Sequence, residues 1–260
     1  MTMKLGCSLS GVEIRDDMTA CQRLAALAVA GLVMLTGCTE AEAPDGPAFD
    51  GPMVLALTWQ PAFCEGRSKV RECRSQRAGR FDAQNLSLHG LWPGPRGVEY
   101  CGVDRETRRL SWSRLPGLRL DKPMQQRLLE VMPGTQSFLH RHEWTKHGTC
   151  YGTNEQRYFT DALSLLDEVN GSSLRTLLAR SVGREVSTRA LRDAVSRDYG
   201  RGAGERLSVT CKRDGRRNLM LELRFNLAGG IEDGLAGALS RGRRVGEGCR
   251  SGIVDPVGLQ

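Results

Sequence analysis

The apolar positions of the chain predict two early strands. Met53–Trp59 is a short apolar run bounded by a proline on each side, which is typical of a buried strand. Asn85–Leu91 alternates apolar and polar residues, with Leu88 and Gly90 on its apolar face and His89 on its polar face. The pattern therefore predicts that His89 faces away from the core.

Helical spacing dominates the middle of the chain, and alternation returns near its end. Helices are predicted at Asp121–Met132, from Thr135 or Ser137 through a histidine-rich segment, after a capping Asn154, and at Thr188–Tyr199. Strands are predicted at Leu207–Cys211 and Asn218–Leu227, and a loop at residues 94–120. Strands at both ends with helices between them indicate an α+β fold: a single domain with a mainly antiparallel central sheet and several flanking helices.

The N-terminal segment has the pattern of an export signal. Residues 24–35 are apolar or small and match the apolar core of a secretory signal. They are too few to span a bilayer, which needs ~20 residues. The residues Leu35–Cys38 (LTGC) resemble a bacterial lipobox, which implies cleavage before Cys38 and acylation of its thiol. Ordinary cleavage after Ala43 is the alternative, and it would leave a soluble protein.

These features divide the chain into three parts. We expect a lipoprotein-type signal peptide at residues 1–37, with Met18 as an alternative start. Residues 38–52 are small, acidic and rich in Pro and Gly, so we expect a flexible tether. The domain occupies residues 53–260. The expected location is a bacterial periplasm, with the protein attached to a membrane through Cys38 or otherwise soluble or secreted.

Composition changes this picture mainly through the cysteines. The 260 residues are 40% hydrophobic and 26% charged, which excludes collagen-like, coiled-coil and wholly disordered chains. Two of the nine cysteines precede Cys38 and six follow it. Six cysteines in an exported chain predict three disulfides, with 15 connectivities open. A zinc site is disfavoured because no two of the six have paired-ligand spacing. The net charge of +7 is compatible with a polyanionic partner but does not identify one.

Candidate chemistry is concentrated in one segment, because three of the four histidines lie between positions 140 and 147. On a helix, His142, Glu143, Lys146 and His147 share one face. Such a face is costly to bury unless its groups serve one another or an anionic ligand. We expect His140 to be an extra polar surface residue, and the Arg-rich residues 175–217 to be a solvated surface.

Three interpretations of this face compete. A solvated polar face fits poorly with the apolar side chains interleaved among the charges. A metal site is disfavoured because the second histidine falls at i+5 rather than i+4, with Lys146 between the two. Acid–base catalysis on a phosphate fits best, since histidine titrates near neutrality and Lys146 with a cationic His142 would stabilise phosphoryl charge. His89 would supply the second acid or base, with Trp92 nearby to stack on a base. Cys150 as a thiol nucleophile is disfavoured against a disulfide.

At this point two segments carry a family resemblance. Leu88–Pro93 (LHGLWP) and His142–Cys150 (HEWTKHGTC) resemble the two active-site segments of the ribonuclease T2 family, in the same order. Thr58–Cys64 and Leu221–Phe225 resemble the family's first and last core strands. The similarity covers about residues 53–250.

The resemblance implies roles for individual residues. His89 corresponds to the general acid and His147 to the general base. His142 would hold the phosphate, while Glu143 and Lys146 would stabilise the phosphorane. The remaining implied sites are a base-binding Trp92, the weaker base-binding candidates Gln60 and Phe138, and the disulfides Cys64–Cys73, Cys101–Cys150 and Cys211–Cys249.

The expected function is a metal-independent endoribonuclease that cleaves single-stranded RNA with little base specificity. Attack by the ribose 2′-OH would give 2′,3′-cyclic phosphate ends, which are then hydrolysed. Two alternatives remain: a T2-like protein that binds RNA or polyanions without turnover, and a metal-dependent hydrolase that uses the same histidines. We expect RNA as substrate, no cofactor, no metal, no protein partner, a membrane contact through Cys38, and a monomer.

Overall fold

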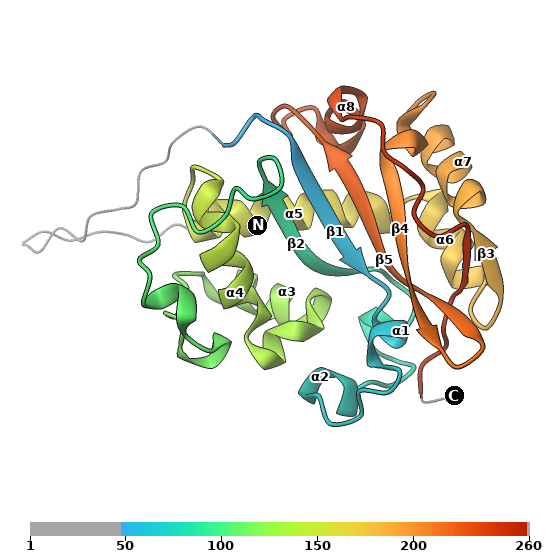
Figure 1. Cartoon of the computed structure of the whole chain (residues 1–260), viewed down its shortest axis with the longest axis horizontal. Coiled ribbons are helices and arrows are strands. Elements are labelled where there is room, and N and C mark those ends of the chain that lie inside the picture. Colours follow the sequence, from blue (N-terminus) through green and yellow to red (C-terminus); the bar gives the residue numbers. More distant parts are fainter. Residues whose placement is uncertain (1–47, 259–260) are drawn as a thin grey trace, which may run out of the picture. The chain divides into compact units, whose positions relative to one another are not determined.

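The computed structural model describes residues 48–258 of the chain (Figure 1). The predicted signal peptide, the acylated Cys38 and most of the predicted tether lie outside the described residues and stay predictions. The helices are α1 (Gln60–Cys64), α2 (Arg71–Arg74), α3 (Lys122–Val131), α4 (Leu139–Lys146), α5 (Glu155–Asn170), α6 (Ser173–Arg180), α7 (Thr188–Tyr199) and α8 (Gly234–Arg241). The strands are β1 (Met53–Thr58), β2 (Ser87–Pro93), β3 (Glu185–Ser187), β4 (Leu207–Asp214), β5 (Arg217–Leu227) and β6 (Ser251–Ile253).

One mixed sheet organises these elements. Its strands follow the order β2-β1-β5-β6-β3, and β4 pairs with β5 outside this path. Every pairing of these strands is antiparallel except that of β5 with β6, which is parallel. The prediction of an α+β fold with a mainly antiparallel sheet is therefore confirmed.

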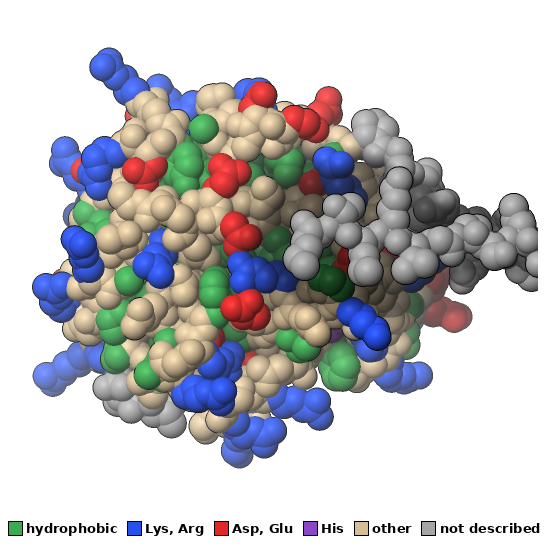
Figure 2. All heavy atoms as spheres, turned by 180° about the vertical axis from the view of Figure 1, so that it is seen from behind, with side chains coloured by type: hydrophobic (Ala, Val, Ile, Leu, Met, Phe, Trp, Pro, Cys, Tyr) green, Lys and Arg blue, Asp and Glu red, His purple; other side chains and the backbone are tan. Residues whose placement is uncertain are grey.

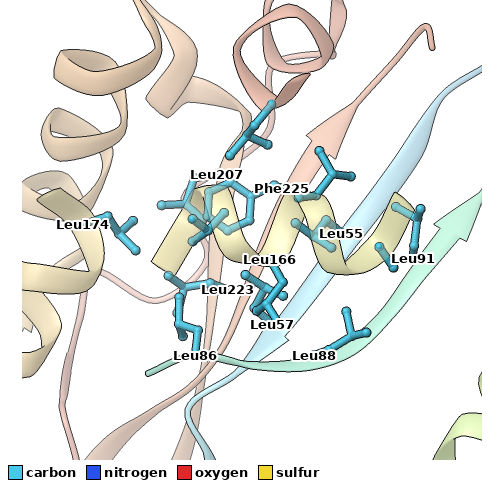
Figure 3. Packing of buried hydrophobic residues seen from close by; sticks show 14 of the residues in the cluster. Leu55, Leu57, Leu86, Leu88, Leu91, Leu166, Leu174, Leu207, Leu223 and Phe225 are labelled. Atoms are coloured by element: carbon cyan, nitrogen blue, oxygen red, sulfur yellow. The ribbon is translucent and has the colours of Figure 1, made fainter. Parts of the chain in front are cut away.

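The core lies between the sheet and α5, which crosses behind the strands (Figure 1). Alternate residues of β5 face this layer, as the sequence pattern predicts, and α5 contributes the apolar stripe that follows Asn154. Figure 3 shows these side chains pointing toward one another: Leu55 and Leu57 of β1, Leu88 and Leu91 of β2, Leu223 and Phe225 of β5, and Leu166 of α5. The opposite face of the sheet is left for polar residues.

A β-bulge in β2 changes one expectation. Ala56 pairs with Gly90 but Leu57 pairs with Leu88, so His89 is the extra residue of the bulge. Alternation shifts there, and Leu91 rather than Gly90 joins Leu88 in the core. A Cβ added to Gly90 would point at the Glu143 carboxylate. The prediction that Gly90 shares the apolar face is therefore wrong, because a sequence pattern does not reveal an inserted residue.

The predicted helices agree with the structure except around residues 133–138. The helix at α3 is confirmed with Asp121 as its cap, and so are α5 behind Asn154 and α7. The helix expected from Thr135 or Ser137 is instead a 3₁₀ helix, Pro133–Ser137, followed by α4. Phe138 separates the two with a left-handed backbone (φ 66°). Four elements were not predicted at all: α6, α8, and the three-residue strands β3 and β6.

Three disulfides fasten the periphery to this framework. They join Cys64 to Cys73, Cys101 to Cys150, and Cys211 to Cys249, the pairs that the family resemblance implies. The second disulfide attaches the long loop after β2 to the 3₁₀ turn Gly148–Cys150 behind α4. Among residues 48–258, no helix combines the length and the apolar character needed to cross a bilayer.

Candidate active site

Three elements bring the chemically active side chains together on the polar face of the sheet. β2 carries His89 and Trp92, and α4 carries His142, Glu143 and Lys146 and ends at His147. β5 adds Glu222 and Arg224, which alternate with the core-facing leucines of that strand. The five residues predicted as catalytic are thus placed on β2 and α4, which pack against each other.

Glu143 is the buried centre of the cluster. It is only 1% exposed, and its Oε2 accepts a hydrogen bond from Trp92 Nε1 at 2.7 Å. Its Oε1 lies 3.6 Å from His89 Nε2. Burial raises the pKa of this carboxyl to about 6, against the lowering influence of His89 and of the Trp92 hydrogen bond. Glu143 therefore keeps a proton at a higher pH than an ordinary glutamic acid.

His89 is held by carboxylates on both sides. Its Nδ1 lies 2.6 Å from Glu222 Oε2, while Nε2 faces Glu143. Burial lowers the pKa of the imidazole, but the Glu222 hydrogen bond and the charges of Glu143 and Glu222 outweigh this, so the pKa is raised. Burial also opposes ionisation of Glu222, yet its bonds to His89 and Arg224 lower its pKa. The pair therefore favours the imidazolium–carboxylate form.

His147 has the opposite environment. Its ring lies against Trp92, with 5.3 Å between ring centroids, and its buried Nδ1 has no hydrogen-bond partner among residues 48–258. Burial, together with the charges of Lys146, His142 and His89, lowers the pKa of His147 to about 3. This imidazole is therefore neutral at pH 7 and can accept a proton.

His142 differs from the expectation in its charge. Its ring stacks on Trp112, with centroids 4.5 Å apart and planes at 23°. Burial and the neighbouring Lys146 lower the pKa of His142 to about 4, so the imidazole is neutral at pH 7 rather than cationic. A neutral ring still offers one N–H to a phosphate oxygen. The fixed cation of this face is Lys146 alone.

The loop after β2 positions the end of α4. Lys146 Nζ lies 3.4 Å from Glu99 Oε2, and the Tyr100 N–H donates to the Lys146 carbonyl at 2.7 Å. The Cys101–Cys150 disulfide closes this contact covalently. On the other side, the Tyr158 hydroxyl of α5 donates to the Leu91 carbonyl at 2.8 Å, which satisfies the free edge of β2 beside the bulge.

The weaker base-binding candidates have different outcomes. Gln60 is 4% exposed, and its amide nitrogen faces Cys64 Sγ at 3.7 Å. Its prediction is therefore wrong, because an enclosed amide is not accessible to a base. Phe138 is half-buried at the N-terminus of α4, beside Arg141, and its role stays a prediction. His140 is half-buried rather than a fully exposed surface residue.

Three residues at the site were not singled out from the sequence: Glu222, Arg224 and Trp112. Glu222 Oε1 accepts from Arg224 Nε at 2.6 Å, and the Arg224 guanidinium lies over the Trp92 ring at 5.3 Å. A signal existed for the first two, since a core strand with charged residues on its second face needs a reason for them. Trp112 gave none, because it lies in an irregular loop.

The cluster presents one protonated and one neutral imidazole around a shared tryptophan. Such a pair can donate a proton at one point of a substrate and remove one at another. Within the described residues, no group of three or more His, Cys, Asp or Glu side chains is arranged to hold a metal ion.

Comparisons with known proteins identify a family pattern. The model of the Ribonuclease T2 family matches residues 50–233. Ribonuclease I of Escherichia coli (strain K12) is 33% identical over 184 residues, which cover 61% of this chain and 69% of that protein. Ribonuclease 1 of Arabidopsis thaliana is 26% identical over 166 residues, which cover 63% and 69%. The crystal structure of RNase NT in complex with 5′-AMP superposes with a TM-score of 0.52 at 19% identity, over 79% of this chain and 98% of that one, and it agrees in fold.

Proposed function

Because the chain belongs to the ribonuclease T2 family and is an RNA-cleaving enzyme, we propose that it cleaves single-stranded RNA through the ribose 2′-OH, without a metal ion and with little base specificity. The observation that carries the mechanism is the contrast between two imidazoles beside Trp92. His89 contacts two carboxylates, whereas His147 contacts none among residues 48–258 and adjoins Lys146. The contrast favours an acid at His89 and a base at His147.

The first step is an intramolecular displacement at phosphorus. His147 takes the proton of the 2′-OH, and the 2′-oxygen forms a bond to the adjacent phosphorus. The bond from phosphorus to the 5′-oxygen breaks, and that oxygen takes a proton from the His89 imidazolium. The products are a 2′,3′-cyclic phosphate and a free 5′-hydroxyl. DNA lacks the attacking hydroxyl and is expected to resist cleavage.

The remaining residues of α4 stabilise charge on the phosphorane. Lys146 supplies a cation, and His142 supplies an N–H that is held in place by the Trp112 ring. Glu143 would repel a phosphoryl oxygen if it were ionised. Its raised pKa, increased further by a bound phosphate, instead favours a neutral acid that donates a hydrogen bond. The same phosphate charge raises the pKa of His147 and improves it as a base.

Hydrolysis of the cyclic phosphate reverses the two roles. After the first step His147 is protonated and His89 is neutral. His89 then takes a proton from water, the water oxygen bonds to phosphorus, and the 2′-oxygen leaves with the proton of His147. A 3′-phosphate end results, and both histidines return to their starting states.

The test is cleavage of a defined RNA by purified protein in excess EDTA, with the ends identified by mass spectrometry. We expect cyclic-phosphate ends, and we expect His89→Ala and His147→Ala each to lose nearly all activity. His140→Ala is the matched control, because His140 lies on the same helix but outside the proposed machinery, and it should remain active. Turnover only with added metal would favour the hydrolase alternative. Tight RNA binding without cleavage would favour the non-catalytic alternative.

We further propose that the enzyme is exported and anchored through an acylated Cys38, and that it acts as a monomer. The apolar segment at residues 24–35, the LTGC sequence and the three disulfides support export, because disulfides persist in oxidising compartments. All proposed catalytic residues belong to one chain, which supports a monomer. Cys38→Ala should move the protein from the membrane fraction to the soluble fraction. Continued membrane association would refute anchoring at this residue.

A further inference from the structure

A groove of about 700 Å³ opens from one side of the proposed active site. Its inner end is lined by Trp92 and His147. Its floor is formed by the start of β1 and the end of β5, and its walls are formed by residues 94–99 and by residues around 243–245. The volume lies in the upper half of the range for small-molecule pockets, so the groove has room for more than one base.

The direction of this groove follows from the histidine that lines it. His147 borders the groove, whereas His89 and His142 are not among its lining residues. In the proposed reaction the base contacts the 2′-OH of the nucleotide on the 5′ side of the broken bond, and the acid contacts the leaving nucleotide on the 3′ side. A groove on the base side therefore continues toward the 5′ end of the RNA.

The groove is basic through three arginines. Arg224 at its floor is bonded to Glu222 and lies over Trp92. Arg96 and Arg243 stand on opposite walls, are exposed, and form no salt bridge or side-chain hydrogen bond with any residue in the range 48–258. The acidic residue that lines the groove, Glu99, is within salt-bridge distance of Lys146.

This arrangement is more specific than the overall charge of the protein. On the rear face in Figure 2, Lys and Arg side chains are scattered over the surface, with Asp and Glu side chains among them. In the groove, two exposed arginines without an acidic partner face a channel that begins at a tryptophan. Single-stranded nucleic acid is bound by such a combination of an aromatic platform and cations along the backbone, and guanidinium groups suit phosphate oxygens.

We propose that this groove binds the RNA chain upstream of the cleaved bond, with Arg96 and Arg243 contacting the phosphates that precede the nucleotide at Trp92. The inference rests on the proposed function and adds to it a preference for chain length with a defined direction. Cleavage should be faster when the substrate is extended on its 5′ side than when it is extended on its 3′ side.

The test compares three substrates with one cleavable bond, the other sugars being 2′-deoxy: a dinucleotide, the same unit with two added 5′ nucleotides, and the same unit with two added 3′ nucleotides. For the wild type we expect the highest kcat/KM on the 5′-extended substrate. Arg96→Ala/Arg243→Ala should lower that value about 10-fold or more, toward the dinucleotide value, and leave the dinucleotide unchanged. Its dependence on salt should also weaken, because each lost phosphate contact removes about 0.7 from the logarithmic salt slope on a single strand.

The matched control removes two arginines elsewhere. Arg71 and Arg74 belong to α2, near the end of the sheet opposite the groove (Figure 1), so Arg71→Ala/Arg74→Ala removes the same charge. An equal effect of both double variants would overturn the inference in favour of general charge attraction. An effect on the 3′-extended substrate, or no effect at all, would overturn it while the proposed function stands. A wild type that cleaves none of the three substrates would refute the proposed function, and the inference with it.

Discussion

The contact between Glu222 and His89 makes a prediction that separates a catalytic from a structural role. Glu222 Oε2 lies 2.6 Å from His89 Nδ1, and its other oxygen binds Arg224 at 2.6 Å. Glu222→Gln keeps the shape and one hydrogen-bond acceptor but removes the charge that favours the imidazolium. The pKa of His89 should therefore fall, and the proposed general acid should lose its proton at a lower pH.

The size of the effect follows from the kind of bond that is lost. Hydrogen bonds to charged groups contribute roughly 1.5–3 kcal/mol, and they are about twice as strong as bonds between neutral groups. Losing the charge but not the bond thus costs roughly 1–1.5 kcal/mol, or about a tenfold lower kcat/KM above neutral pH. At acidic pH the loss should be smaller, because His89 is protonated there without the help of Glu222.

The assay is the pH profile of kcat/KM on a short RNA, which reports the essential acid and base of the free enzyme. In Glu222→Gln the alkaline limb should move to lower pH. Glu130→Gln is the control, because Glu130 is an exposed partner of Arg127 on α3, and its profile should match the wild type. A uniform loss of rate with an unmoved alkaline limb would refute the reasoning, since it would mean that Glu222 only holds the fold.

Three further predictions concern the support of the site. Gly90→Ala would place a Cβ 2.0 Å from Glu143 Oε2, so kcat should fall at least about tenfold with little change in thermal unfolding, and full activity would contradict the packing described. Replacing both Cys101 and Cys150 by Ser should cost about 2–5 kcal/mol in urea unfolding and also lower kcat, because the loop that binds Lys146 is freed; unchanged kcat would argue against that coupling. Burial and Glu65 raise the pKa of Asp255 to about 6 from 3.8, so the native state binds the proton more tightly and the free energy of unfolding falls as pH rises from about 4 to 6. Asp255→Asn should flatten this fall, and an unchanged slope would assign it to other groups.

The sequence predicted the chemistry of α4 better than its surroundings. Helical spacing alone grouped His142, Glu143, Lys146 and His147, because four neighbouring turn positions need no knowledge of tertiary structure. His89 and Glu222 are 133 residues apart, and their contact depends on the pairing of three strands. The charge of His142 could not be predicted either, since it follows from burial beneath a loop tryptophan. Short strands such as β3 leave too few residues for a pattern.

The bulge at His89 has an evolutionary consequence. In a regular strand, residues on one face are separated by an even number of positions. His89 and Trp92 share the polar face at a separation of three, and Gly90 supplies the additional residue. Loss of the Gly90 codon would give a more regular strand with Leu88 and Leu91 still facing the core, but would draw Trp92 about 3.3 Å along the strand, away from its bond to Glu143. One in-frame deletion would thus yield a well-folded descendant that no longer cleaves RNA, so in this lineage loss of catalysis does not require loss of the fold.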